Sequence, residues 1–171
     1  PEAVELLPRD TSLLPFAGER DFKNLYSSTV MVNQGDPLAG AECSGVLIGP
    51  RLVLTAGHCV CLPRALAMPD SPARTVIDST SCAARASVTT VISGTVRTEE
   101  LADLRIHTYA GTVRPHPEFK LLLDSKKTLL SSTADLAVIV LDKPVHPPLT
   151  GAPLADAEVQ PNEFLVMAAF G

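Results

Sequence analysis

The sequence predicts an all-β protein, a barrel or a sandwich. Short runs of β-branched and aliphatic residues alternate with Gly, Pro and Asn turn signals along most of the chain. No segment holds a long apolar pattern of helical period. The chain is 46% hydrophobic but has five Phe, two Tyr and no Trp. The predicted core is therefore aliphatic and lies between strands.

The predicted strands follow one another from residue 28 onward. Gly49-Pro50 separates two of them as a turn, and Lys143-Pro144 stops another. A Pro-rich connector over 145–163 blocks both helix and central strand. Residues 121–133, LLLDSKKTLLSST, are ambiguous and are compatible with a short helix. The predicted strand segments are 28–33, 44–49, 51–57, 87–96, 104–113, 135–141 and 164–171.

Charge and hydropathy exclude several partners. The formal net charge is −5 and the pI is near 5.3, with no basic stretch that would follow a phosphate backbone. No apolar run has the length of a membrane span. The opening residues PEAVELLPRD have neither a basic region nor a long apolar run, so we expect no signal peptide here. Neither nucleic acid nor membrane is a predicted partner.

Four cysteines, Cys43, Cys59, Cys61 and Cys82, permit three disulfide pairings. The C-x-C of HCVC, with His58 beside it, is also compatible with a zinc site. A zinc site of this kind would need a second cluster, whereas Cys43 and Cys82 stand alone in the sequence. Disulfides are the favoured use, and they indicate an oxidising compartment. We therefore expect a secreted or periplasmic protein without a metal or other cofactor.

Two motifs, CSGVLIGPRLVLTAGHCV (43–60) and STADLAVIVLDKPV (132–145), resemble the chymotrypsin/trypsin superfamily of serine peptidases. Bacterial members, including the glutamyl-endopeptidase-like branch, show a similar TAGHCV form. VRPHPEF (113–119) resembles the family's His-Pro segment, and the closing AAFG resembles its Gly-aromatic-Gly element, with Ala169 in place of the first Gly. The resemblance runs in order through about 26–171.

The resemblance implies a double β-barrel of which this chain supplies a part. Residues 25–145 would form the first barrel, with an inserted loop at 61–86. Residues 146–171 would hold the crossover and the opening strand of the second barrel. Residues 1–24 are Pro- and charge-rich and are expected to be an extended N-terminal segment or a propeptide remnant. Arg9 and Arg20 are candidate processing points for a zymogen.

His58 and Asp135 are the predicted catalytic residues. By resemblance, His58 is the general base and Asp135, at the start of an apolar strand, orients its imidazole. A hairpin turning at Gly49-Pro50 would bring Cys43 opposite Cys59 and anchor the turn that bears His58. Cys61 and Cys82 then pair by elimination. Gly57 would permit close backbone approach, and Thr55 would hydrogen-bond near a buried Asp135.

No serine of this chain has the Gly-flanked setting of a family nucleophile. The candidates weighed are Ser44, Ser93, Ser131 and Ser132. Because the family order is His, Asp, Ser, we expect the nucleophile downstream, on a C-terminal fragment of the same precursor. A nick in an exposed loop soon after Gly171 would leave that fragment as a partner chain, with polypeptides as substrates.

Other chemistry-bearing residues have plainer interpretations. His107, His116 and His146 are read as solvated or turn histidines, and Asp103 and Asp124 lack an apolar strand. Asp70 and Asp78 alone do not make a calcium site. Two alternatives to the endopeptidase stay open: an inactive binding or adaptor module on the same fold, and a metal-dependent hydrolase that uses His58 and the cysteines.

Overall fold

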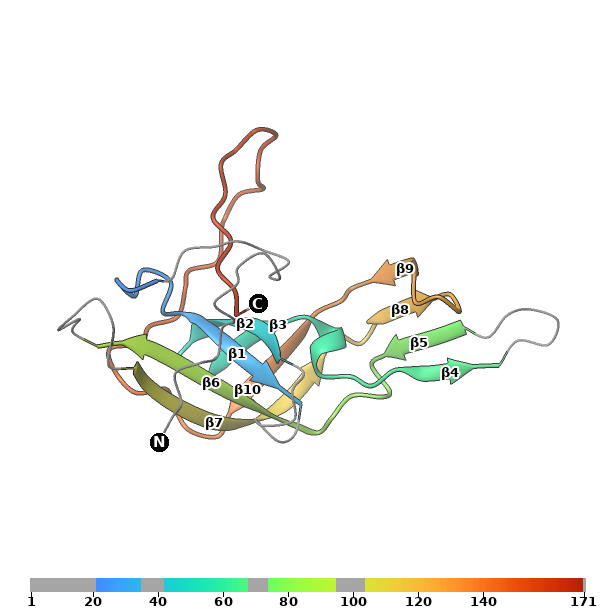
Figure 1. Ribbon diagram of the computed structural model, residues 1–171, viewed down its shortest axis with the longest axis horizontal. Helices are drawn as coiled ribbons and strands as arrows, with labels where there is room; N and C mark the ends of the chain where they lie inside the picture. Colours follow the sequence, from blue (N-terminus) through green and yellow to red (C-terminus); the bar gives the residue numbers. More distant parts are fainter. Residues whose placement is uncertain (1–20, 35–41, 68–73, 95–103, 171) are drawn as a thin grey trace, which may run out of the picture.

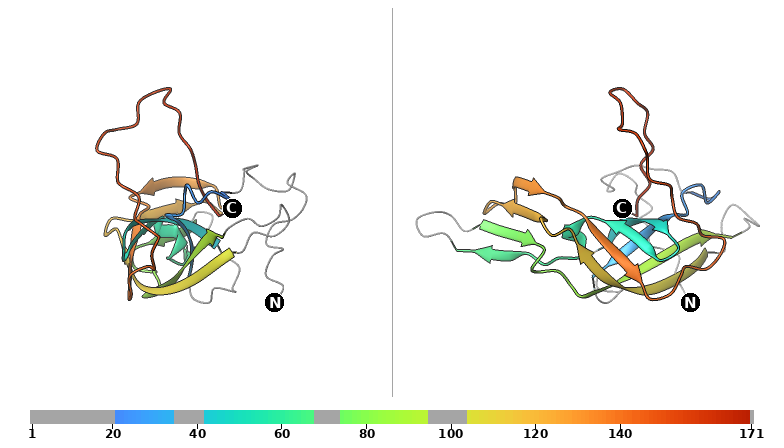
Figure 2. Two further views of the ribbon diagram at one scale, coloured as in Figure 1. Left: turned by 90° about the vertical axis from the view of Figure 1, so that its left-hand side faces the viewer. Right: turned by 180° about the vertical axis from the view of Figure 1, so that it is seen from behind.

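The computed structural model describes residues 21–34, 42–67, 74–94 and 104–170. Six antiparallel strands close into a barrel with the spatial order β1-β2-β3-β10-β7-β6, seen in Figure 1 and from the end and behind in Figure 2. The barrel strands are β1 (Thr29–Asn33), β2 (Glu42–Gly49), β3 (Leu52–Thr55), β6 (Arg85–Ser93), β7 (Leu104–Pro115) and β10 (Ala137–Leu141). The all-β barrel predicted from the sequence is confirmed.

Strand β10 closes the barrel because it pairs on both edges. It runs antiparallel to β3 on one side, where Ala137 lies opposite Thr55, and to β7 on the other, where Ala137 lies opposite Pro115. The chain reaches Ala137 directly from Asp135, and it leaves Thr55 directly toward His58. The pairing of Ala137 with Thr55 therefore brings these two segments together.

The core is aliphatic, as the composition predicts. Side chains alternate between inside and outside along β10, in the pattern buried, half-buried, buried, half-buried, buried. The residues with no exposed surface are mainly valines and branched aliphatics from several strands: Val30, Val32, Leu47, Val53, Val60, Val88, Ile139 and Leu141. This packing holds the barrel wall that carries the site.

A second sheet of four strands, which we call the arm, extends from one end of the barrel (Figure 1). Its order is β4-β5-β8-β9, all antiparallel. Its strands are β4 (Arg64–Leu66), β5 (Arg74–Asp78), β8 (Lys120–Leu123) and β9 (Leu129–Thr133). Within the insertion predicted at 61–86, the described residues include β4 and β5, and the ambiguous segment 121–133 forms the β8–β9 hairpin.

The predicted closing strand at 164–171 is not formed in the described residues 164–170. Instead 146–170 make a long excursion that leaves the barrel and returns to it (Figures 1 and 2). Both ends of the excursion are held on β2: the Ala152 amide donates to the Leu47 carbonyl at 2.7 Å, and the Phe170 amide donates to Ser44 Oγ at 2.8 Å. Between them Phe164 is fully exposed. A strand needs a hydrogen-bonded neighbour, and within the described residues 164–169 form no backbone hydrogen bond to another segment.

Candidate active site

His58 lies on a single 3-10 turn, Gly57–Cys59 (η2), which follows β3 directly. Ala56 is extended, and the amides of Cys59 and Val60 donate to the carbonyls of Ala56 and Gly57. A turn this short holds its shape only if it is attached on both sides. The disulfide from Cys59 to Cys43 on β2, with a Cα separation of 5.8 Å, supplies one attachment.

Phe119 supplies the other attachment. It is 1% exposed, and its ring lies flat against Gly57: a Cβ at position 57 would come within 2.8–2.9 Å of three ring carbons. Only glycine fits such an approach. The sequence indicated Gly57 as a close-approach residue but did not identify the ring that approaches it. The available signal was the Phe that ends the VRPHPEF segment.

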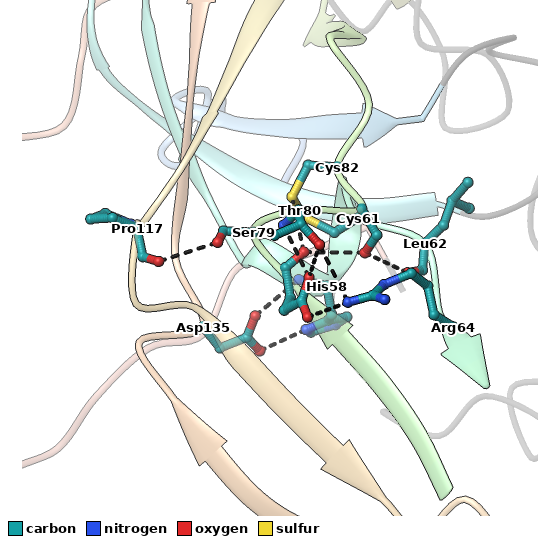
Figure 3. The surroundings of a disulfide bond; sticks show 11 residues. His58, Cys61, Leu62, Arg64, Ser79, Thr80, Cys82, Pro117 and Asp135 are labelled. Carbon is teal, nitrogen blue, oxygen red and sulfur yellow. Dashed lines mark hydrogen bonds and ion pairs between the residues drawn. A yellow bond between two sulfur atoms is a disulfide. The ribbon is translucent and has the colours of Figure 1, made fainter. Parts of the chain in front are cut away.

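Asp135 lies between β9 and β10 and binds His58 twice (Figure 3). Its Oδ2 is 2.7 Å from His58 Nδ1, and its Oδ1 accepts the backbone amide of His58 at 2.9 Å. An ionised carboxylate only accepts hydrogen bonds, so Nδ1 carries the donated proton. In a neutral ring the other nitrogen, Nε2, is then the acceptor.

The carboxylate is held by a tight turn of its own. Ala134 has a φ of 43°, and the Leu136 amide donates to the Ala134 carbonyl at 2.7 Å across Asp135. The Leu136 carbonyl in turn accepts the His116 amide. Asp135 is partly exposed, at 24%, rather than fully buried as expected. Thr55 does not bond to it; its hydroxyl donates to the Ser44 carbonyl at 3.0 Å.

The geometry prepares an imidazole for proton transfer. Asp135 fixes the tautomer and the ring orientation, and the His58 side chain is 47% exposed. Among the described residues no serine hydroxyl bonds to His58. Ser44 Oγ accepts the Phe170 amide, Ser93 Oγ donates to the Asp21 carbonyl, and Ser131 and Ser132 lie exposed on β9.

The cysteines are paired Cys43–Cys59 and Cys61–Cys82. Potential ligand atoms of Cys43, His58 and Cys59 lie within 4.8 Å of one another. Two of the three are sulfurs of one disulfide, which is not the thiolate that binds zinc. The donor set therefore does not fit a zinc centre while the disulfide is intact.

The remaining sequence candidates lie apart from His58 and have local roles. His116 Nδ1 accepts the Glu118 amide, and the His107 and His146 rings stack edge-on at 5.4 Å. Asp124 Oδ1 accepts the amides of Lys126 and Thr128 in the β8–β9 turn. Asp78 binds Arg64 and Thr80. Asp70, Asp103, Arg9 and Arg20 are outside the described residues.

The His58 turn, its disulfide and its carboxylate on a six-stranded barrel define the class of protein. The sequence profile of the trypsin family, described as Trypsin, matches residues 18–171, and the chain therefore belongs to this family of serine protease fold. No curated protein matches the chain closely enough to be compared with it. Within the described ranges, no helix is long and apolar enough to cross a membrane.

Proposed function

We propose that this chain carries the general base and the orienting acid of a serine endopeptidase. The observation that carries the proposal is the double contact of Asp135 with His58, at 2.7 Å on the ring and 2.9 Å on the backbone. A surface ion pair would need only the first contact. The second holds the His58 backbone to the same carboxylate, which positions the whole residue for repeated proton transfer.

The proposed reaction is acyl transfer. His58 Nε2 takes the proton from a serine hydroxyl as its oxygen bonds to the carbonyl carbon of the substrate. The proton then passes to the departing amine as the peptide bond breaks, and water releases the acyl group by the reverse sequence. Asp135 remains ionised and stabilises the imidazolium formed at each step.

We further propose that the serine is supplied by a second polypeptide, the C-terminal fragment of the same precursor after a nick. The apolar residues Phe164, Leu165, Val166 and Met167 support this arrangement, because their exposed fractions are 102%, 69%, 71% and 72%. Four consecutive apolar side chains in water are unfavourable and call for a covering partner. Their excursion returns to Ser44, the neighbour of Cys43 behind His58, so a partner seated there lies near the imidazole.

The proposed location is secreted or periplasmic. Two disulfides within 40 residues persist in an oxidising compartment and are rare in a reducing one. A zymogen stage, with processing near Arg9 or Arg20, belongs to the same proposal.

A fluorophosphonate probe tests the enzyme. The probe phosphonylates a serine only when a base has activated it, so the native sample should show a labelled companion fragment. The His58→Ala variant, purified in the same way, should lose the label, and Ser131→Ala should keep it. An unlabelled companion in a fully processed sample would contradict the enzyme and favour the adaptor module. That alternative also agrees with the observation that no serine hydroxyl among the described residues bonds to His58.

Intact-mass analysis of the native sample tests the two-chain arrangement separately. We expect this 18.1 kDa chain together with a second species that carries a Gly-framed serine. A single species of 18.1 kDa in an active sample would contradict the nick.

A further inference from the structure

The arm adjoins both site residues through the chain. Strand β9 ends at Thr133, two residues before Asp135, and β4 begins at Arg64, six residues after His58. Both site residues are therefore connected to the arm by short stretches of chain.

The arm is joined firmly to the turn that carries His58. The Cys61–Cys82 disulfide closes its base, and the Ser79 amide donates to the Phe119 carbonyl at 3.2 Å. Phe119 is the residue that packs on Gly57, and Lys120 immediately after it begins β8. The disulfide, the hydrogen bond and the packing of Phe119 therefore attach the base of the arm to the turn that carries His58.

A hollow of about 310 Å³ lies on the arm. Its apolar wall comes from Pro63, Ala65, Ile77 and Leu123, and its rim includes Lys127. Strand β4 borders it and is an edge strand whose three residues are all exposed. The outer backbone groups of an edge strand are available to pair with another extended chain.

The arm is positive on an otherwise acidic molecule. Its four strands and the β8–β9 turn hold five basic and two acidic residues, a formal charge of +3 in a chain of net charge −5. Both acids are engaged: Asp78 binds Arg64, and Asp124 accepts two backbone amides. Among the described residues no carboxylate forms an ion pair with Lys120, Lys126 or Lys127.

We propose that the arm docks an extended, acidic segment of the polypeptide substrate. The segment pairs with the free edge of β4, places one apolar side chain in the hollow and directs its carboxylates toward Lys126 and Lys127. An apolar pocket with cations at its rim selects an apolar side chain flanked by acidic residues. The lysines attract the negative charge of those residues, whereas the rest of the acidic surface repels it. The inference rests on the proposed function for its substrate, but its binding step needs no catalysis.

Binding is tested on the complete protein with His58→Ala, which prevents turnover. The probe is a fluorescein-labelled peptide of alternating leucine and glutamate, measured by fluorescence anisotropy. Lys126→Glu with Lys127→Glu should weaken binding about tenfold or more at low salt, with the loss shrinking at high salt. The single charge reversal Lys143→Glu, just beyond the end of β10, is a control away from the arm and should leave binding unchanged. Ala65→Trp, which fills the hollow, should also weaken it.

Three outcomes would overturn the docking site. They are unchanged affinity in the double lysine variant, equal affinity for a glycine-glutamate peptide that cannot use the hollow, and tighter binding of a leucine-lysine peptide. Equal affinity for a single-stranded oligonucleotide would likewise show a general polyanion surface rather than a polypeptide site.

Kinetics on the wild-type complex separate this site from the proposed function. The double lysine variant should raise KM for an acidic protein substrate about tenfold and leave hydrolysis of a small ester unchanged. Loss of ester hydrolysis in the variant would contradict a docking role. If the wild type hydrolyses no ester, the proposed function fails, and the anisotropy experiment still decides the docking site.

Discussion

At the scale of single residues, the contact between Gly57 and Phe119 decides how well His58 is held. Gly57→Ala would put a methyl group 2.8 Å from Phe119 Cδ1, inside van der Waals contact, and a ring that is 1% exposed has no space to withdraw. We expect a loss of about 1–3 kcal/mol in the free energy of unfolding and a larger proportional loss of activity. Urea denaturation and ester hydrolysis measure the two.

Gly49→Ala is the matched control for this substitution. A Cβ there would meet Leu52 at 3.8 Å, an ordinary contact, so the free energy of unfolding should change by less than about 0.5 kcal/mol. Phe119→Leu in the Gly57→Ala background should restore part of the activity, because it shortens the obstructing side chain. Equal stability of Gly57→Ala and Gly49→Ala would show that the ring is not fixed against the turn.

At the scale of the elements, the acid Asp78 ties β4 to β5. The Thr80 hydroxyl, which donates to its carboxylate, and Arg64 beside it lower the pKa of Asp78 below its ordinary 3.8. A depressed folded pKa contributes stability above the unfolded pKa and loses it as pH falls through the folded value. The ionised carboxylate, through Thr80 and Arg64, should therefore stabilise the arm at neutral pH. This contribution should begin to fall near pH 3.8 and vanish as the pH passes below the lowered pKa.

Asp78→Asn should accordingly lower hydrogen-exchange protection of β4 and β5 at pH 7, while protection of the barrel strands stays the same. In thermal denaturation, the difference from wild type should shrink as pH falls below 3.8. Asp156→Asn, an exposed carboxylate of the connector, is the control and should show no difference at either pH. A constant deficit of Asp78→Asn across this range would contradict the charge of the Asp78 carboxylate as the cause.

The arm also shows where prediction from sequence stops at this scale. LLLDSKKTLLSST contains leucines spaced for either a helix or a hairpin, and the pattern alone does not decide between them. The hairpin forms because β5 offers a neighbour: Ile77 lies opposite Leu121 and Asp78 opposite Lys120. That neighbour is distant in sequence, because Asp78 and Lys120 are 42 residues apart, and it is brought there by the barrel.

At the scale of the whole molecule, two kinds of apolar residue have opposite roles. Val53 in the barrel has no exposed surface, whereas Val166 on the excursion is 71% exposed. Val53→Asp would bury an unpaired carboxylate, and we expect it to abolish folding. Val166→Asp should leave the melting temperature unchanged but reduce co-purification of the serine-bearing fragment. Circular dichroism and pull-down of the native complex measure the two effects.

Phe164→Asp is tested in parallel. If both variants recover as much of the serine-bearing fragment as the wild type does, the excursion is not the surface that binds this fragment. The excursion is anchored through backbone amides to Leu47 and Ser44, so neither substitution removes its attachment to the barrel.

The sequence by itself determined the all-β class, the strands of the barrel and the identity of the residues worth testing. Those are local properties: β-branched alternation, turns at Gly49-Pro50, and a His–Cys motif with a later Asp before an apolar strand. Tertiary structure alone decided that Asp135 binds both the ring Nδ1 and the backbone amide of His58, that Phe119 supports Gly57, and that β4 and the β8–β9 hairpin share one sheet. It also decided that 164–170 do not form a strand. These depend on which distant segments become neighbours, and hydrogen-bond partners and steric contacts exist only after the barrel has closed.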